Sequence, residues 1–484
     1  MSENNNKSKI IYLHIVIGFF LMFLFGRVIP PIYPLTEVGM QVAGVFVGVV
    51  WLWVTIGFLW PSLIALVAFG LTDFASFGQV VQMAFGSQVP MLLLFSMVLF
   101  GSPEHVGATS YITRWFLSRK IFNNRPIVFS FIFFVATYSI SVAVNVTPAL
   151  VLMWGVLYSV LKELNYKPGD KYSTLMIIGT FLGAISGQAS LPFRGSTLAI
   201  LSAFETSSGM PMPPLQYILL GFIMSVTVFV IYCLFMKFVF KPDTSKIAHV
   251  NAEMFNKNPL PPMTKLQKAN FFGLLLFVFL VLLPSFLPAD FIITELIEGL
   301  QPVGIAILLI GVMCMVKIEG QPILDFKAVA AKSVHWEVYL FVVAAMAITG
   351  ALTNEATGIL DMLVTVLGPI LGGHSPIMLF IIMLLIAIFA TSFASSLVIG
   401  VAFMPIIVVF GVEAGANLPA MAATTVLLLH YAIILPAASA FAAMLWGNEE
   451  WVTRKEVFKY GAYIVAFAVV VAIGIIMPLS LMLF

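Results

Sequence analysis

Charged residues and cysteines are scarce in this chain of 484 residues. Only 9% of the residues are charged and 61% are apolar, so the chain cannot present the water-compatible surface of a soluble protein of this length. The net charge of +2 provides no basic surface of the kind that nucleic-acid binding needs. Cys233 and Cys314 lie in separate apolar segments, which favours buried free thiols over a disulfide framework or a metal site. These absences indicate a polytopic membrane protein.

The apolar runs are long enough to cross a lipid bilayer as helices, which takes about 17 to 25 residues. Two runs, 126–163 and 376–412, are long enough to enter the membrane, turn and leave on the same side. We therefore predict an all-α polytopic membrane protein with about eleven transmembrane helices and two re-entrant hairpins. The predicted crossings are 10–28, 38–56, 58–71, 88–112, 172–204, 215–237, 267–287, 302–318, 335–352, 418–448 and 460–483.

The two halves of the chain share a pattern. Glu104 and Gly107 recur as Glu355 and Gly358, and each half contains a long apolar run that small polar residues interrupt. Broken apolar segments at matching positions of two inverted repeats are typical of secondary transporters, because unwound backbone at membrane depth persists only around a protein-lined cavity. The predicted divisions are an N-terminal helix and connection (1–35), a first inverted repeat (36–240, broken helix 172–204), a cytoplasmic linker (241–266) and a second inverted repeat (267–484, broken helix 418–448).

Lys and Arg concentrate in loops on one side of the predicted membrane. With the N-terminus in the cytoplasm, all of the 23 basic residues except Arg27 and Arg194 fall on the cytoplasmic side, as the positive-inside rule expects. Three of them, Arg114, Arg119 and Lys120, lie in the loop before the first hairpin. The odd number of crossings then places the C-terminus outside the cell membrane.

Small polar residues interrupt the first hairpin and the helix that follows it. The hairpin tip contains Asn145 and Thr147, and the break in 172–204 contains Arg194, Gly195 and Ser196. Gly, Ser and Pro inside an apolar segment form a poor helix, and their polar groups suit a bound ligand. The alternative is tight helix packing through small residues. We predict that these five residues bind the substrate.

Arg194 is the most informative of these residues. Its guanidinium stays charged at ordinary pH and is costly at membrane depth, so it must face a cavity or a partner. The planar guanidinium suits a carboxylate, which predicts an organic anion as the substrate. The alternatives are that Arg194 extends to the membrane interface, or pairs with a fixed acid such as Glu104 or Glu205.

The second half contains a similar set of polar residues. Its hairpin tip includes Ser395 and Ser396, and its broken helix ends with Asn448. We predict that these three residues also bind the substrate. His430 precedes the break, where it can accept a proton or donate a hydrogen bond to an anion. A lone histidine on an apolar helix is, however, more often structural.

The segment FATSFASSLVIGVAFMP at 389–405 resembles the second hairpin of the divalent anion:sodium symporter (DASS) family, within the ion transporter superfamily. The family has a Ser-Asn-Thr motif at each hairpin tip. Ser395 stands at the motif serine, with Ser396 and Leu397 in place of Asn and Thr. In the first hairpin Val144, Asn145 and Val146 stand where Ser, Asn and Thr would be.

This resemblance implies a homodimer that moves its substrate by an elevator-like displacement of a transport domain. It also implies sodium sites at the hairpin tips, of which the second falls on Thr391, Ala394 and Ser396. The first site loses side-chain oxygens at Val144 and Val146 and lies near the fixed charge of Arg194. A cation beside a guanidinium is unfavourable, so we expect the first site to be absent or weakened.

The predicted function is secondary active transport of organic anions of the di- or tricarboxylate class, by sodium-independent exchange or by proton coupling. The predicted partners are that anion, the lipid bilayer and a second copy of the chain, with no cofactor and no nucleic acid. One alternative is a sodium-coupled dicarboxylate or sulfate symporter, and another is an anion channel. An intramembrane enzyme is disfavoured because the chain contains no His-Glu-x-x-His motif and no paired intramembrane aspartates.

Overall fold

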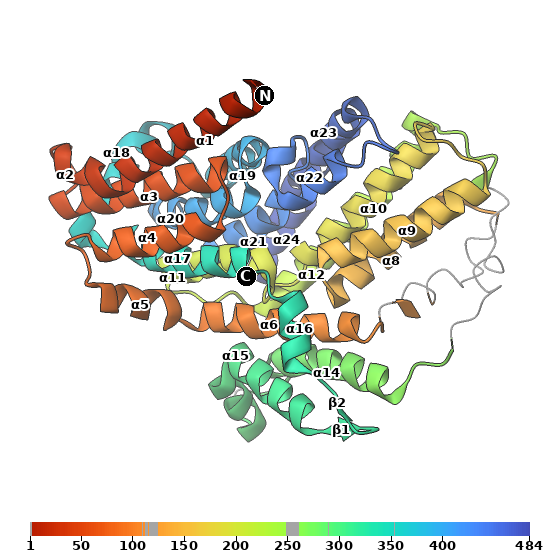
Figure 1. Ribbon diagram of the computed structural model, residues 1–484. Helices are drawn as coiled ribbons and strands as arrows, with labels where there is room; N and C mark the ends of the chain where they lie inside the picture. The colour runs from red at the N-terminus through yellow and green to blue at the C-terminus, as the bar shows by residue number, and fades with distance from the viewer. Residues whose placement is uncertain are drawn as a thin grey trace. The chain divides into compact units, whose positions relative to one another are not determined.

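The computed structural model describes residues 2–108, 110–111, 115, 124–247, 261–288, 290–352 and 354–484. Most of the predicted linker (248–260) and the loop residues Arg114, Arg119 and Lys120 lie outside the described residues. Ten of the described helices are long and apolar enough to cross a membrane, or up to twelve spans if each of two bent helix pairs counts as one. The predicted all-α polytopic fold is confirmed (Figure 1). The strands in the described part are β1 (Lys317–Ile318) and its antiparallel partner β2 (Gln321–Pro322).

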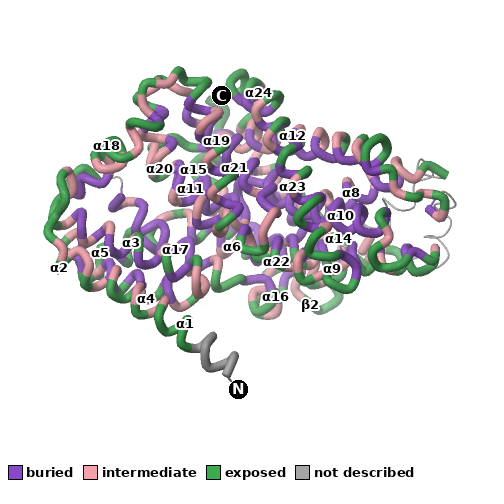
Figure 2. The backbone as a smooth tube through the Cα atoms, turned by 90° about the horizontal axis from the view of Figure 1, so that it is seen from above, coloured by how far each residue is buried: buried purple, intermediate pink, exposed green. Residues whose placement is uncertain are grey.

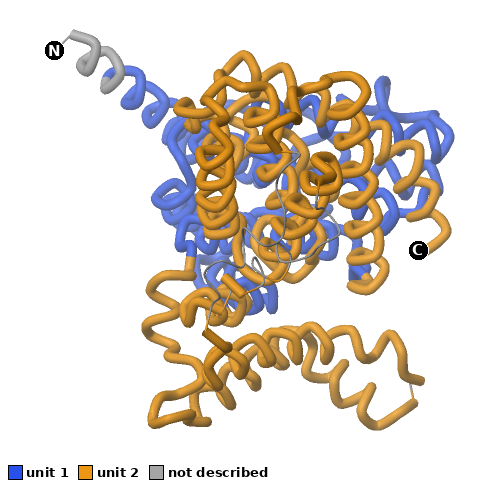
Figure 3. The backbone as a smooth tube through the Cα atoms, turned by 90° about the vertical axis from the view of Figure 1, so that its right-hand side faces the viewer, with its two compact units in different colours: residues 1–94, 198–212, 335–425 blue, residues 95–197, 213–334, 426–484 orange. Residues whose placement is uncertain are grey.

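The chain divides into two compact units, each built from three separate segments (Figure 3). Unit 1 comprises 1–94, 198–212 and 335–425, and unit 2 comprises 95–197, 213–334 and 426–484. Helices α6 (Gln88–His105), α11 (Gly195–Ser208) and α21 (Leu418–Leu429) each begin in one unit and end in the other.

Unit 1 contains the first helices of the chain and the second hairpin. In its helix α17 every residue from Phe341 to Thr349 is buried, which suits a segment that is apolar on all sides, whereas Trp336 at the start of the helix is exposed (Figure 2). Thr36 caps α3 by accepting a hydrogen bond from Gly39 N at 2.9 Å. The elements of unit 1 are α1 (Ser2–Phe19), η1 (Phe20–Phe25), α2 (Gly26–Val28), α3 (Glu37–Thr55), α4 (Leu59–Gly70), α5 (Phe77–Phe85), α17 (Trp336–Leu352), η6 (Glu355–Thr357), α18 (Ile359–Leu371), α19 (Pro376–Phe393) and α20 (Ser396–Glu413).

Unit 2 contains the first hairpin and the C-terminal helices. Its central helix is α10, in which every residue from Tyr172 to Ala189 is buried (Figure 2). The elements of unit 2 are α8 (Pro126–Ala143), α9 (Val146–Glu163), α10 (Lys171–Ala189), α12 (Pro214–Phe235), η3 (Met236–Phe240), α14 (Lys265–Leu282), η5 (Leu283–Phe286), α15 (Ile292–Met315), α16 (Phe326–Ser333), η7 (Pro436–Ala438), α22 (Ala440–Trp446), α23 (Arg454–Val471), η8 (Ala472–Ile476) and α24 (Met477–Leu483).

The two predicted hairpins are two helix pairs of equal size. Each of the four arms, α8, α9, α19 and α20, has 18 residues. Pro126 and Pro376 begin the first arms, where proline loses no helical hydrogen bond. An 18-residue arm is about 27 Å long, which is also enough to cross a bilayer. The re-entrant path therefore rests on the charge distribution and stays a prediction.

Both predicted helix breaks are present. Residues 190–194 separate α10 from α11, and 430–435 follow the end of α21. The helix predicted at 302–318 is the second part of α15. Gln301 has non-helical dihedral angles (φ 54°, ψ 171°), so α15 consists of two helices joined at a kink, and the second begins at Pro302 and ends at Met315.

Helix α10 packs closely against α8 through three glycines, Gly179, Gly183 and Gly187, which lie on one face of the helix. A Cβ atom at Gly183 would lie 2.7 Å from Phe134 O, and one at Gly187 would lie 2.6 Å from Tyr138 O. These spacings leave no room for a side chain. Gly183 and Gly187 therefore serve close packing of the two helices, which was the alternative to a binding role for the small residues of this segment.

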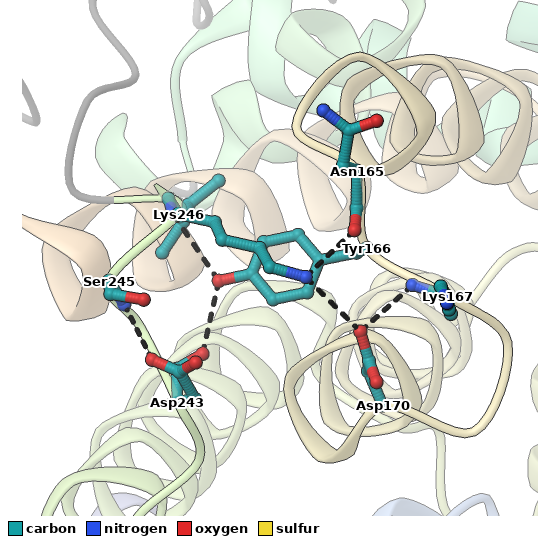
Figure 4. Close-up of polar contacts among 8 residues, drawn as sticks. Asn165, Tyr166, Lys167, Asp170, Asp243, Ser245 and Lys246 are labelled. Atoms are coloured by element: carbon teal, nitrogen blue, oxygen red, sulfur yellow. Dashed lines mark hydrogen bonds and ion pairs between the residues drawn. The ribbon is translucent and has the colours of Figure 1, made fainter.

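The beginning of the linker is held against the loop between α9 and α10 (Figure 4). Lys246 Nζ lies 2.7 Å from Asn165 O and 3.7 Å from Asp170 Oδ2, and 4.8 Å from the centre of the Tyr166 ring. The Tyr166 hydroxyl donates a hydrogen bond to Asp243 O at 3.0 Å. We call residues 165–170 and 243–247 the linker contact.

Candidate functional site

Arg194 lies in the break between α10 and α11 and donates hydrogen bonds to the end of α8. Its Nη1 is 2.9 Å from Val142 O, and its Nη2 is 2.6 Å from Ser141 O. The guanidinium carbon lies 4.9 Å from the centre of the Phe100 ring, at a distance typical of a cation–π contact. The residue is only 1% exposed. Arg194 thus joins the break to the tip of the first hairpin.

The two alternative positions of Arg194, at the membrane interface or beside a fixed acid, are not observed among the described residues. Backbone carbonyl oxygens receive its hydrogen bonds, and the ion pairs among the described residues, Lys246–Asp170 and Arg454–Glu449, do not include it. A side chain that is 1% exposed does not extend to an interface. The carbonyls at a helix C-terminus carry partial negative charge, which is why they suit a buried cation.

His430 meets the beginning of α11 directly after the same break. Its Nε2 lies 3.1 Å from Ser196 Oγ and 3.2 Å from Thr197 Oγ1. The Gln188 amide in turn donates to Ser196 Oγ at 2.6 Å. His430 and Ser196 are partly exposed, whereas Gln188 and Thr197 are buried. We call these four residues the polar cluster.

The contacts of His430 determine where its hydrogen lies. Nδ1 is 2.8 Å from Val426 O, and a carbonyl oxygen can only accept, so Nδ1 carries the hydrogen of the neutral ring. Nε2 is then an acceptor for the Ser196 hydroxyl. Protonation would turn Nε2 into a donor and would free the Ser196 hydrogen for another acceptor.

Gly195 is the residue that begins α11 and sets the position of Ser196. Its φ of +53° lies in the left-handed region, which glycine adopts without strain. A Cβ atom there would lie 3.4 Å from Gln188 Nε2. Gly195 thus forms a turn that brings Ser196 to the polar cluster, and its predicted contact with the substrate stays a prediction.

The predicted residues of the first hairpin, Asn145 and Thr147, are at least partly exposed. Asn145 precedes α9, but its side chain makes no capping hydrogen bond, and the residue is partly exposed. Thr147 is exposed, with its Oγ1 3.9 Å from Met444 Sδ. Asn448 lies elsewhere in unit 2: its amide donates to the Tyr158 hydroxyl at 2.6 Å. Tyr158 is about 18 Å along α9 from the hairpin tip, by the helical rise, so this contact holds Asn448 away from that tip.

The predicted residues of the second hairpin lie in unit 1. Ser395 precedes α20 without a capping hydrogen bond, and Ser395 and Ser396 are partly exposed. Thr391 is buried, and its hydroxyl donates to Ala387 O and Ile388 O of its own helix. Ala394 is the extended residue between α19 and α20. No group of three or more His, Cys, Asp or Glu residues that suits a metal ion occurs among the described residues.

The roles of three residues around the break, Gln188, Phe100 and His430, are harder to predict from the sequence. Gln188 belongs to the run of small polar residues, but its amide alone does not indicate a contact with Ser196. Phe100 carries no signal that distinguishes it from the other 43 phenylalanines of the chain. Of the three, only His430 can be identified as a candidate from the sequence, because it is a histidine at the end of an apolar run.

A protein-family model described as a citrate transporter matches residues 46–429. The chain belongs to the CitMHS citrate transporter family. This family is a member of the ion transporter superfamily, and the match does not specifically support the resemblance to the DASS family. The matched range includes both hairpins and the first break, and it ends one residue before His430. No curated protein matches the chain.

CitMHS membership makes the chain a carboxylate transporter of multi-span membrane architecture. Fold and family therefore agree on a multi-pass membrane protein. A tricarboxylate needs donors for several carboxylate oxygens, and the polar cluster, with the free amide of Asn145, contains uncharged donors of that kind.

Proposed function

We propose that this protein is a secondary active transporter that takes citrate or a related di- or tricarboxylate across the membrane by alternating access. One observation carries the proposal. Partly exposed polar side chains from the two halves of the chain, Ser196 and His430, meet at a helix break next to a buried guanidinium. Polar groups at membrane depth are costly unless they serve a ligand or one another.

Each group has a distinct task in this proposal. The Ser196 hydroxyl and the Asn145 amide donate hydrogen bonds to carboxylate oxygens, while Arg194 supplies positive potential from behind the hairpin tip. Because Arg194 is buried under Phe100, its charge acts through space. At an effective dielectric of about 20, such a charge still stabilises an anion 8 Å away by roughly 2 kcal/mol.

We propose the proton as the coupling ion. His430 is the ionisable side chain of the polar cluster, and protonation adds both a positive charge and a donor where the anion binds. The freed Ser196 hydrogen then points to the substrate carboxylate. Binding of the anion and of the proton would favour each other, as coupled transport requires.

Sodium coupling remains the competing hypothesis. It would use Thr391, Ala394 and Ser396, where hydroxyl and backbone oxygens suit a hard cation. The Thr391 hydroxyl donates within its own helix, so its lone pairs stay available to a cation. Sodium dependence of uptake distinguishes the two hypotheses.

Three further parts of the proposal rest on the charge distribution or on the family resemblance. These are the cytoplasmic N-terminus, a homodimer, and elevator-like movement of a transport domain. The two hairpins belong to different compact units.

Uptake of radiolabelled citrate into proteoliposomes tests the proposal. We expect saturable uptake and counterflow, in which unlabelled citrate inside accelerates entry of labelled citrate, together with competition by di- and tricarboxylates but not by monocarboxylates. Uptake that does not saturate and shows no counterflow would indicate an anion channel. The absence of any carboxylate uptake would refute the proposed function.

A further inference from the structure

We infer that Arg194 is a positioning residue: it holds the tip of the first hairpin against the break between α10 and α11 and does not itself contact the substrate. The inference rests on the proposed function, because it assigns a role within that transport site. In this role the guanidinium forms no ion pair with the substrate. It holds the hairpin tip in place and contributes positive potential from a distance.

The first argument is the hydrogen-bonding need of the end of α8. The last helical bond runs from Val144 N to Ile140 O. The next carbonyls, of Ser141 and Val142, have no helical partner because the chain turns at Val144 and Asn145. At membrane depth no bulk water replaces the missing donors. Arg194 supplies both of them with its two terminal nitrogens.

The second argument is access. Two carbonyl oxygens occupy the guanidinium on one side, the Phe100 ring lies over it, and the residue is 1% exposed. A substrate carboxylate could reach Arg194 only by displacing the two carbonyls. That displacement would leave them unpaired in the membrane, which costs more than the exchange of one acceptor for another.

The third argument is that other contacts join the same two elements. The Ser141 hydroxyl donates to Ala184 O of α10 at 2.6 Å. The close approach of Gly187 to Tyr138 O and Ser141 Cβ lies on the same turn of α8. Arg194, which follows the end of α10, adds its two hydrogen bonds to these contacts with α8. The hairpin tip with Asn145 and the break with Ser196 therefore form one rigid body during transport.

Cysteine accessibility at the tip tests the inference without requiring substrate. The probe is Asn145→Cys in a full-length protein in which Cys233 and Cys314 are replaced by alanine, reacted with a small maleimide. We expect Arg194→Gln to raise the labelling rate about tenfold, because the tip loses its two charge-assisted bonds. Arg194→Lys keeps the charge but cannot make the planar fork, so we expect an intermediate rate.

Transport kinetics provide the second measurement, in proteins that retain Asn145. Arg194→Gln should lower the maximal citrate uptake rate about tenfold and change KM by less than about threefold, and Arg194→Lys should recover part of the rate. Arg27→Gln is the matched control, because exposed Arg27 also donates to backbone carbonyls. It should leave both labelling and uptake unchanged.

Three results would overturn the inference about Arg194. A tenfold rise in KM with unchanged labelling and maximal rate would show that Arg194 contacts the substrate, and would overturn the inference. Unchanged labelling in Arg194→Gln would also overturn it. If Arg194→Gln does not fold, Phe100→Leu, which leaves the guanidinium in place, must raise labelling or the inference fails. Failure of the wild type to take up any carboxylate would refute the proposed function, while the labelling result would still decide the role of Arg194.

Discussion

Ser196 Oγ and His430 Nε2 lie 3.1 Å apart, although 234 residues separate them in the chain. Ser196 is the second residue of α11, directly after the first helix break, and His430 begins the second break. The contact therefore joins the interrupted helices of the two halves. It links a residue that we propose for the anion site to the residue that we propose as the proton carrier.

The first prediction concerns the hydroxyl of Ser196. Ser196→Ala removes the donor to His430 and the acceptor of the Gln188 amide, so citrate uptake should fall about tenfold. Ser202→Ala is the matched control on the same helix, because that hydroxyl only donates to Leu198 O four residues earlier. Uptake by this control should stay within about twofold of the wild type.

A double-mutant cycle sharpens this prediction. The effects of Ser196→Ala and His430→Gln should be less than additive, because each variant removes the same contact. Additive losses would show that the two side chains act independently, and an equal loss in Ser202→Ala would assign the effect to packing of α11.

The second prediction concerns the packing of α10 against α8. Gly187→Ala places a Cβ atom 2.6 Å from Tyr138 O, so the two helices must separate, at a cost of about 1–3 kcal/mol. The melting temperature of the purified protein in detergent should fall. Gly155→Ala is the control: it lies in helix α9 with nothing within 4 Å, and alanine there should be neutral or stabilising. Equal melting temperatures for the two variants would contradict the account.

The third prediction is a pH dependence at the linker contact. Burial raises the pKa of the Tyr166 hydroxyl to about 12, above its usual value of about 10. Because the folded pKa is the higher one, the contribution of the neutral hydroxyl is complete below about pH 10 and is lost as pH rises through about 12. Tyr166→Phe removes the bond to Asp243 O and cannot titrate.

Melting temperatures of the wild type and of Tyr166→Phe, measured from pH 7 to 11.5, test this prediction. The difference between them should be constant up to about pH 10 and should shrink above it. Both proteins contain Lys246 and the same remaining charges, so general effects of alkaline pH cancel in the difference. A difference that shrinks already at pH 8 would contradict a buried, neutral Tyr166.

Much of the fold follows from local sequence. The lengths of apolar runs and the prolines at 126 and 376 predict the helices, the two hairpins and both breaks, because these features act within a few residues of the chain. The kink within α15 also follows from local sequence. Gln301 leaves the helical region and Pro302 suits the first turn of a helix, so the second part of α15 begins where the sequence predicts.

The site is less predictable than the fold for a physical reason. The sequence indicates that Arg194 needs a partner, but its partners are the carbonyls of Ser141 and Val142, and every residue has a carbonyl. The role of His430 likewise depends on Ser196, which only the tertiary structure brings near. Gly183 and Gly187 fit both a binding surface and close packing, and only the distance to α8 decides for packing.

Citrate uptake driven by a pH gradient in sodium-free proteoliposomes tests the central claim most directly. The wild type should accumulate labelled citrate when the side from which it enters is acidic. His430→Gln should lose this accumulation but keep citrate counterflow, because glutamine can hydrogen-bond to Ser196 but cannot carry a proton. Accumulation by His430→Gln that equals the wild type, or a wild type that accumulates citrate only with sodium, would contradict proton coupling through the polar cluster.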